Sequence, residues 1–487
     1  MGLSSLTDIY IKLRAYAGLP LSGNPTKQLV RDSAITSAAV TLFSMSVLLQ
    51  TSCLMNPLAV IAASLALGGL LGMPLLYITL YLRGVERGRR VEKEFKYLII
   101  SNSLAFGRNT NIIQDLSEMS GSWRELFPAL SREGRIISQL SRIMSLRDVV
   151  RTYVSWIRSR FVKTLLNDYI FSMSLGVQDV WVRRKGDEIV EELKNESTTK
   201  IKARIMLGMV IAVVLGYVPP LAAALSLLMG GGIIPTVAAV TIMVAAAAIA
   251  SIPRYPHHLR THTRRGLTRA LSLVVLGTST LLFITGSFPR TSLLIGGFTL
   301  AIIGILEARG YLSIFVEASE LSKLLTMLGE APLEMSNVFN ILKEYLQKSG
   351  LSSFRRLGSE LTLLHTPPSI SMMRLWITRF SIYTLLKGVK EGTLTREMLL
   401  KLSDLVNEAL KDIKASLLSG LVITSMALFL PFLLNYIKAV GGVMSVPEAY
   451  IVTASVIYSV YSSAVIFDDP LNPLIPGVVL IELWLTG

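Results

Sequence analysis

The sequence predicts an all-α polytopic membrane protein with about nine transmembrane helices and two duplicated cytoplasmic helical-bundle domains. Three observations predict this class. Hydrophobic residues make up 51% of the 487 residues, and charged residues only 17%, below the roughly 25% usual in soluble domains. Long apolar runs recur, with lysines and arginines gathered between alternate runs. One eleven-residue segment occurs twice, at an offset of 212 residues.

The first element is a predicted amphipathic helix at the N-terminus. Apolar residues recur there at helical spacing, at Leu3, Leu6, Tyr10, Leu13 and Ala17. Charged residues are expected off this stripe, at Asp8, Lys12 and Arg14. The pattern predicts a helix that lies either on the membrane surface or on the protein's own domain.

Nine segments are predicted as membrane spans, because a spanning helix needs about 20 mostly apolar residues. They cover residues 34–52, 58–82, 203–228, 233–252, 268–286, 291–307, 415–437, 447–466 and 474–486. The ninth segment is short and carries Glu482, so it either crosses as a tilted span or dips into the interface. Two breaks, Met229–Pro235 and Gly286–Thr291, have the glycines and prolines of tight turns and leave no room for extracellular domains.

The basic residues orient these spans. Of the 48 lysines and arginines, 46 fall on one side if every candidate spans, and only Arg290 and Lys438 fall on the other. The positive-inside rule then places the N-terminus in the cytoplasm and, with nine spans, the C-terminus outside. The acidic inner turn at Asp468 and Asp469 is the exception. Topology accounts for the formal net charge of +15, so no nucleic-acid partner is expected.

Spans and loops divide the chain into six parts. They are a cytoplasmic amphipathic N-terminal segment (1–33), two spans (34–82), a cytoplasmic helical domain (83–202), four spans (203–307), a second cytoplasmic helical domain (308–414) and two or three spans (415–487). Both loops show apolar residues at 3/4 spacing and no convincing period-two strand, so each is expected to be a helical bundle.

The repeated segment marks where each loop enters the bilayer. "IKARIMLGMVI" begins at Ile201 and "IKASLLSGLVI" at Ile413, and they share six of eleven residues. We predict a domain–membrane joint in each: Lys202 and Lys414 reach toward the headgroups, and Gly208 and Gly420 let a neighbouring helix approach. A good membrane entry simply used twice is the alternative.

Further matches favour duplication of the whole loop. Gly176 and Gly388 each lie 32 residues before the joint glycines. Upstream, "EFKYL" and "ELSKL" align at an offset of 226, so the first copy carries about 14 extra residues. An even number of spans separates the loops, which makes this a parallel duplication.

With these features the chain resembles the type II secretion system F-domain family. The segment "LSKLLTMLGEAPLEMSNVFNILKEYL" resembles that family's pattern L-x-x-L-L-x-x-x-G-x-P-L-x-x-A-L, with Leu324, Leu325, Gly329, Pro332, Leu333 and Ile341 in the corresponding places. Two such domains and about nine spans resemble the archaeal branch, which serves archaella and adhesive pili. The first copy departs from the pattern, since Gly107 is not followed by Pro-Leu.

The resemblance implies a non-enzymatic platform in the cell membrane. A separate cytoplasmic hexameric ATPase would bind the F domains, and the platform would lift pilin subunits into the filament base. It also implies a homo-oligomer, a dimer or trimer, among membrane lipids. The alternative is a polytopic transporter of a small solute.

Motifs for other chemistry are absent from the sequence. It has no Gly-Lys pair of a P-loop, no "HExxH", no "GxSxG" and one cysteine, Cys53. We therefore expect no catalytic residue, no cofactor and no metal. His257, His258 and His262 lie close together, but no further ligand is nearby, so a basic inner loop is the favoured interpretation.

Arginines in the first loop are the candidates for motor contact. Two sets are spaced to share a helical face, the first being Arg132, Arg135 and Arg142 and the second Arg147, Arg151 and Arg158. Lys387 and Lys390 are weaker candidates in the second loop. A face that contacts anionic lipid, or that is merely solvated, remains the alternative.

Overall fold

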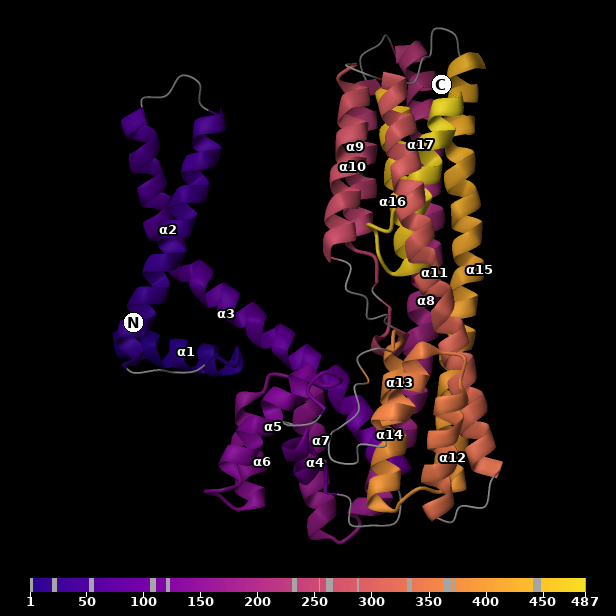
Figure 1. Cartoon of the computed structure of the whole chain (residues 1–487). Helices are drawn as coiled ribbons and strands as arrows, with labels where there is room; N and C mark the ends of the chain where they lie inside the picture. Colours follow the sequence, from indigo (N-terminus) through magenta and orange to yellow (C-terminus); the bar gives the residue numbers. More distant parts are fainter. Residues whose placement is uncertain are drawn as a thin grey trace. The chain divides into compact units, whose positions relative to one another are not determined.

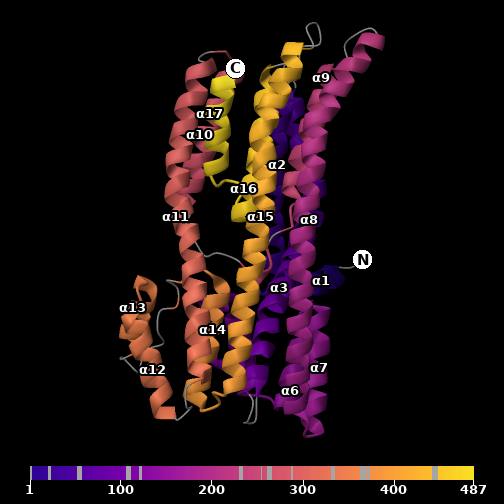
Figure 2. The same cartoon turned by 90° about the vertical axis from the view of Figure 1, so that its right-hand side faces the viewer.

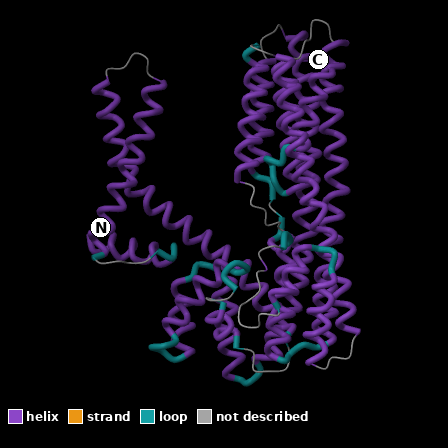
Figure 3. Tube along the Cα trace, viewed as in Figure 1, coloured by secondary structure: helices purple, strands orange, loops and turns teal. Residues whose placement is uncertain are grey.

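The computed structural model describes most of the chain. The described residues are 3–19, 24–51, 57–105, 111–119, 123–229, 234–253, 255–259, 266–286, 289–330, 335–361, 370, 373–440 and 448–486. Helices dominate all the longer segments, with short loops between them (Figure 3). The predicted all-α class is therefore confirmed for this part of the chain. The molecule divides into two compact units, Met1–Ile189 and Val190–Gly487.

The first unit joins a helical hairpin to a small helical bundle. Its helices are α1 (Leu3–Tyr16), α2 (Pro25–Thr51), α3 (Pro57–Leu104), α4 (Ile112–Glu118), α5 (Pro128–Leu140), α6 (Leu146–Trp156), α7 (Arg160–Ser174) and the start of α8 (Gln178–Met229). Helices α2 and α3 form the hairpin (Figure 1). The charged half of α3 continues past Leu82 and packs against α4, α5 and α7.

Local sequence signals explain where the bundle's helices begin. Ser145 caps α6, since its hydroxyl accepts from the Asp148 N–H at 3.4 Å. Ser159 caps α7 in the same way, at 3.2 Å from the Val162 nitrogen. Helix α5 starts with Pro128, whose missing N–H costs nothing at a first helical position.

The second unit consists of long helices around a buried one. Its helices are the rest of α8, α9 (Ile234–Ala250), η1 (His257–Leu259), α10 (Gly266–Ile284), α11 (Pro289–Glu330), α12 (Met335–Lys348), α13 (Ser352–Glu360), α14 (Trp376–Glu391), α15 (Arg396–Val440), α16 (Glu448–Phe467) and α17 (Leu474–Thr486). Helix α16 is the buried one, and α9, α10, α15 and α17 pack against it. Helices α11 and α15 lie alongside each other (Figure 2).

Six helices in the described residues are long and apolar enough to cross a membrane, which makes the chain a membrane protein. They are Ile61–Leu104, Gln178–Val218, Gly266–Ile284, Arg290–Glu330, Arg396–Tyr436 and Glu448–Phe467. The three remaining predicted spans fall elsewhere. One lies in α2, which is rich in serine and threonine, and two lie in shorter apolar helices, Ala239–Ile249 and Leu474–Thr486. The count of nine therefore stays a prediction.

Helix α1 packs on the protein's own hairpin. The apolar stripe of α1 meets α3, where Tyr10 is fully buried against Leu76 and Leu80. The Tyr77 hydroxyl of α3 also donates to the Leu6 carbonyl at 3.0 Å.

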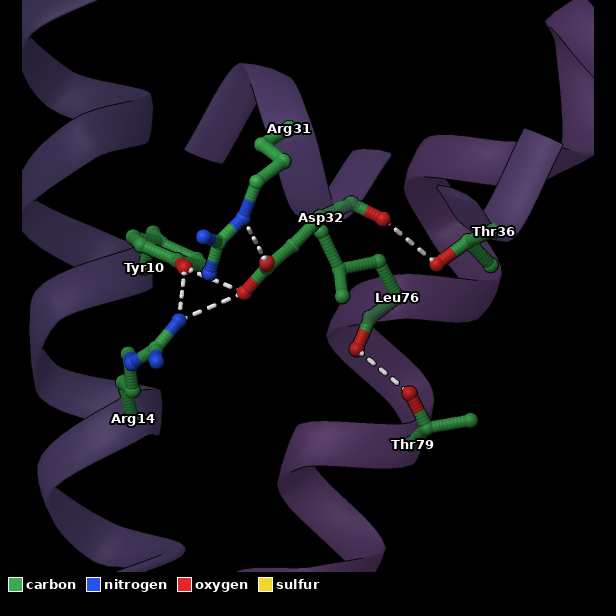
Figure 4. A network of polar contacts seen from close by, with 7 residues as sticks. All are labelled: Tyr10, Arg14, Arg31, Asp32, Thr36, Leu76 and Thr79. Atoms are coloured by element: carbon green, nitrogen blue, oxygen red, sulfur yellow. Dashed lines mark hydrogen bonds and ion pairs between the residues drawn. The ribbon is translucent and has the colours of Figure 1, made fainter. Parts of the chain in front are cut away.

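One detail of the N-terminal prediction is wrong. Arg14, predicted to lie off the stripe, is only 8% exposed and pairs with Asp32 of α2 (Figure 4). The Tyr10 hydroxyl donates to the same carboxylate at 2.7 Å. A carboxylate on α2 beside the stripe gives the arginine a buried partner, which periodicity alone does not reveal.

This ion pair predicts how α1 is held. Arg14→Met removes the cation from a half-buried carboxylate and is expected to weaken docking of α1 by about 1–3 kcal/mol. Hydrogen exchange of the α1 amides in detergent should then become faster by tenfold or more. Lys12→Met is the matched control, because Lys12 is exposed on the same helix. Equal protection in both variants would contradict the role of Arg14.

Candidate functional site at the repeated junction

The repeated segments lie inside the two long helices α8 and α15. Their side-chain burial repeats position by position. Ile201 and Ile413 are buried, as are the residues three, seven and ten positions later in each copy. Lys202 and Lys414 are exposed. Each junction therefore presents the same buried face, and its residues are identical except that Arg204 in the first copy is Ser416 in the second.

The joint glycines lie against α16. A Cβ atom on Gly208 would lie 2.8 Å from Tyr461 Cε1 and 2.9 Å from Ile423 Cδ1. A Cβ atom on Gly420 would lie 2.4 Å from Ile466 Cγ1. Both distances are shorter than carbon atoms tolerate, so each position needs glycine for α16 to pack this closely.

Arg204 is the functional candidate that the sequence reasoning missed. It is 2% exposed, and its Nη2 donates to the Ala464 carbonyl and to Asp468 Oδ1, both at 2.8 Å. Its guanidinium also lies 3.9 Å from the centroid of the Tyr255 ring. The backbone carbonyl of Arg204 accepts a hydrogen bond from the Tyr461 hydroxyl. A buried charge needs such partners, because removal from water is expensive.

Tyr255 connects the two junctions. Its hydroxyl donates to the Val465 carbonyl at 2.8 Å and contacts the Ser416 hydroxyl. Ser416 holds the same place in the second segment as Arg204 does in the first, four residues before the joint glycine. One tyrosine thus contacts equivalent positions of both copies. We name Arg204, Tyr255, Ser416 and Asp468 the junction cluster.

The acidic turn after α16 is explained by its partners. Asp468 pairs with Arg204, and Asp469 pairs with Arg269 of α10 at 2.8 Å. The Asn472 amide in the same turn donates to Glu307 of α11 at 3.3 Å. The turn is therefore neutralised by cations from other helices, which accounts for acidic residues at a position where the basic-residue pattern predicts lysine or arginine.

Below the junction, polar pairs join α8 to α15. The Ser197 hydroxyl donates to Asp412, and Lys194 pairs with Glu408 at 2.7 Å. Both pairs lie in the polar halves of the two helices. The helices are therefore linked on the polar side of the joint as well as through the junction cluster.

His258 is buried close to the junction cluster, in η1. Its pKa is lowered to about 4, mainly by burial; Glu196 opposes this shift and Lys200 adds to it. His257 packs on Trp376, with ring centroids 4.6 Å apart. His262 lies outside the described residues. Among the described residues, no three His, Cys, Asp or Glu side chains are grouped to hold a metal ion.

Most of the predicted motor-contact residues are exposed residues of the first unit. Arg132 and Arg135 are exposed on α5, Arg142 follows its end, and Arg147 and Arg151 are exposed on α6. In the described part of the chain none of these five has an ion-pair partner. The face expected for Arg132, Arg135 and Arg142 is interrupted, because α5 ends at Leu140.

The other motor-contact candidates differ in exposure. Arg158 is half-buried and stacks on the Tyr81 ring at 3.9 Å, so it is held inside the unit. In the second unit Lys390 is exposed, whereas the Lys387 side chain is 10% exposed and lies 4.0 Å from Glu391. Lys390 is therefore the accessible residue of that pair.

No family model, no curated protein and no solved structure matches this chain. The fold and the cluster define its class: an all-helical membrane protein in which two long helices run unbroken from polar into apolar segments.

The buried ion pair gives the first prediction for this site. Arg204→Met leaves Asp468 without its cation and is expected to lower the free energy of unfolding by about 3 kcal/mol. The double variant with Asp468→Asn should recover much of that loss. Thermal unfolding in detergent measures both, and Lys202→Met, exposed two residues away, is the control. A stability loss from the control as large as from Arg204→Met would refute the assignment.

His258 predicts how stability depends on pH. Its pKa is depressed in the folded state, so its contribution is present above pH 6.5 and is lost as the pH falls through about 4. His258→Gln should remove a pH-dependent term on the order of 3 kcal/mol. The measurement is the unfolding midpoint of both proteins from pH 8 to pH 4. Parallel curves would show that His258 does not titrate in this way.

Proposed function

We propose that this protein is the membrane platform of a type IV pilus-like assembly machine, of the kind that builds archaella or archaeal adhesive pili. It couples a cytoplasmic hexameric ATPase to the insertion of pilin subunits at the filament base. The platform itself catalyses no reaction. One observation carries the proposal: two polar helical domains each continue, through a repeated junction, into the helices that surround α16.

Continuous helices suit a coupling role. Helix α8 runs from Gln178 to Met229 and α15 from Arg396 to Val440 without a break. A helix resists bending where its backbone hydrogen bonds are continuous, and both joints lie before the prolines of these helices, which are Pro219 and Pro220 in α8 and Pro431 in α15. A displacement of the polar half therefore moves the joint. Because both joints contact α16, motion of either domain reaches the same buried helix.

Helix packing in the two domains supports their origin by duplication. In the first domain Gly186 of α8 faces α3, where a Cβ would meet the Ser103 side chain. In the second, Gly329 of α11 faces Leu399 and Leu400 of α15. Ser103 and Gly329 are related by the offset of 226 that aligns the start of the domains. At the offset of 212, Leu399 and Leu400 correspond to positions 187 and 188. Gly186 lies within two residues of both positions.

A second pair of contacts points the same way. In the first domain Glu92 of α3 accepts from the Ser159 hydroxyl at 2.7 Å, just before α7. In the second, Glu317 of α11 accepts from the Arg374 N–H at 3.3 Å, just before α14. At the offset of 226, Glu92 corresponds to position 318, one residue after Glu317, so a glutamate near the same place holds the start of the helix that precedes each junction helix.

The remaining features of the platform follow from this function. We infer nine spans with the N-terminus in the cytoplasm, and a dimer or trimer beneath the six-fold motor. The motor contacts the exposed arginines of α5 and α6 through acidic residues, which guanidinium groups pair with in a bidentate manner. Lys390 contributes on the second domain.

Transport of a small solute is the second candidate function, and Glu482 is the observation that favours it. Both carboxylate oxygens of this α17 residue are buried, and neither has a hydrogen-bond partner among the described residues. Ionisable groups inside a membrane segment commonly mark an ion pathway. Glu482→Gln should abolish solute-dependent stabilisation if the protein is a transporter and should leave ATPase binding unchanged if it is a platform.

The platform predicts a stable complex with a hexameric secretion-type ATPase. The two proteins should co-purify in detergent, and Arg135→Glu/Arg147→Glu/Arg151→Glu should reduce the retained ATPase at least tenfold, because it reverses the charges that pair with the motor. Arg132 is left unchanged because it lines a cavity. Arg89→Glu, an exposed arginine of α3, is the matched control. Retention of the ATPase by the folded triple variant would place the contact elsewhere, and failure of the wild-type proteins to associate would overturn the platform.

A further inference from the structure

A cavity of about 440 Å³ lies in the first unit, where the charged half of α3 begins. Its walls are the end of α1 at Ala17–Leu19, the α3 segment from Arg83 to Glu94, and the start of α5 from Pro128 to Ile136. The apolar segment of α3 ends at Leu82, one residue before the cavity begins. The cavity is therefore next to the polar end of the hairpin α2–α3, at the depth of lipid headgroups if α3 spans a membrane.

Most charges in the cavity wall are already compensated. Arg87 makes a bidentate pair with Glu133, with N–O distances of 2.8 and 2.6 Å. Arg90 pairs with Glu86. Glu94 accepts hydrogen bonds from the backbone nitrogen of Leu130 at 2.8 Å and of its neighbour Ala129 at 2.9 Å, so its charge faces the start of α5.

Two arginines in the cavity wall are not compensated by an acidic residue of the described chain. Arg83 and Arg132 line the cavity, are exposed, and have no ion-pair partner in the described part of the chain. They stand on different helices, α3 and α5, across one cavity. Two guanidinium groups placed in this way match an anion with several acceptor oxygens, since each group can donate two parallel hydrogen bonds.

Arg87, whose side chain is 15% exposed, joins three walls of the cavity. Besides pairing with Glu133 of α5, Arg87 donates to the Ala15 carbonyl of α1 at 2.7 Å. Gly18 follows with φ +69°, and a Cβ there would lie 3.1 Å from the Arg87 side chain. Three helices thus meet at one arginine, which keeps the cavity open without a ligand and lowers the ordering cost of binding.

We propose that this cavity binds a phosphate group between Arg83 and Arg132. The phosphate belongs either to the headgroup of an anionic lipid or to a soluble ion or ester. The position beside Leu82 favours the lipid, and Leu19 and Ile136 offer apolar surface to the carbon atoms next to its phosphate. Arg132 then serves this site rather than the motor-contact face. The proposal does not depend on the function of the protein.

The test is a titration of the purified, delipidated full chain in detergent. Dihexanoyl phosphatidic acid is expected to bind, as followed by native mass spectrometry and by the unfolding midpoint. Arg83→Gln/Arg132→Gln should weaken that binding at least tenfold. Ile136→Trp, which fills the cavity without changing its charge, should weaken it too. Arg89→Gln is the control, because Arg89 is exposed on α3 outside the cavity wall.

Two further ligands identify the source of the phosphate. Dihexanoylglycerol, which lacks the phosphate, should not bind. Inorganic phosphate that competes with the lipid, and depends on the same two arginines, would make the site one for soluble anions. Its failure to compete would make the site one for lipid headgroups. Unchanged phosphatidic acid affinity in the folded double variant, or equal binding of dihexanoylglycerol, would overturn the proposal.

Discussion

The second unit depends on how it accommodates one buried charge. Arg204 is the largest side chain among the fully buried ones, and a cation of that size is tolerated away from water only with an anion and acceptors around it. Asp468 and the Ala464 carbonyl supply them to Nη2, whereas Nε and Nη1 are buried without a hydrogen-bond partner among the described residues. Asp468 does so from a backbone conformation with φ +53°, which aspartate adopts more readily than most residues. The ion pair therefore fixes the end of α16, the turn after it and the register of α8.

The close packing of α8 against α16 and the ion pair of Arg204 stabilise each other. Gly208 lets Tyr461 reach the backbone of α8, where its hydroxyl bonds the Arg204 carbonyl. A larger residue at 208 would push α16 away and separate Arg204 from its acceptors. Tyr255 extends the same contacts to α15 through Ser416. The result is a layer in which contacts and close packing hold α8, α15 and α16 to one another.

The sequence predicts the helical class and the positions of close helix approach, but not the partners of buried charges. Apolar runs and 3/4 spacing are local properties, so the chain alone shows them. Asp468 lies 264 residues from Arg204, and no periodicity connects them. Signals for the pair were present: an arginine at the start of an apolar run, and two aspartates in a turn where basic residues are expected. The burial of Arg14 could not be predicted for the same reason, because its partner Asp32 lies on another helix.

The two junctions are alike in sequence, but the polar interactions at their equivalent positions Arg204 and Ser416 differ in strength. In the first, the buried position holds Arg204, and separating its ion pair would leave two uncompensated charges away from water. In the second, the equivalent Ser416 makes a neutral hydrogen bond to Tyr255, which contributes about 1 kcal/mol. Within the cluster, the polar contact of α15 is therefore weaker than that of α8, and α15 is held mainly by its packing against α11, α16 and α17.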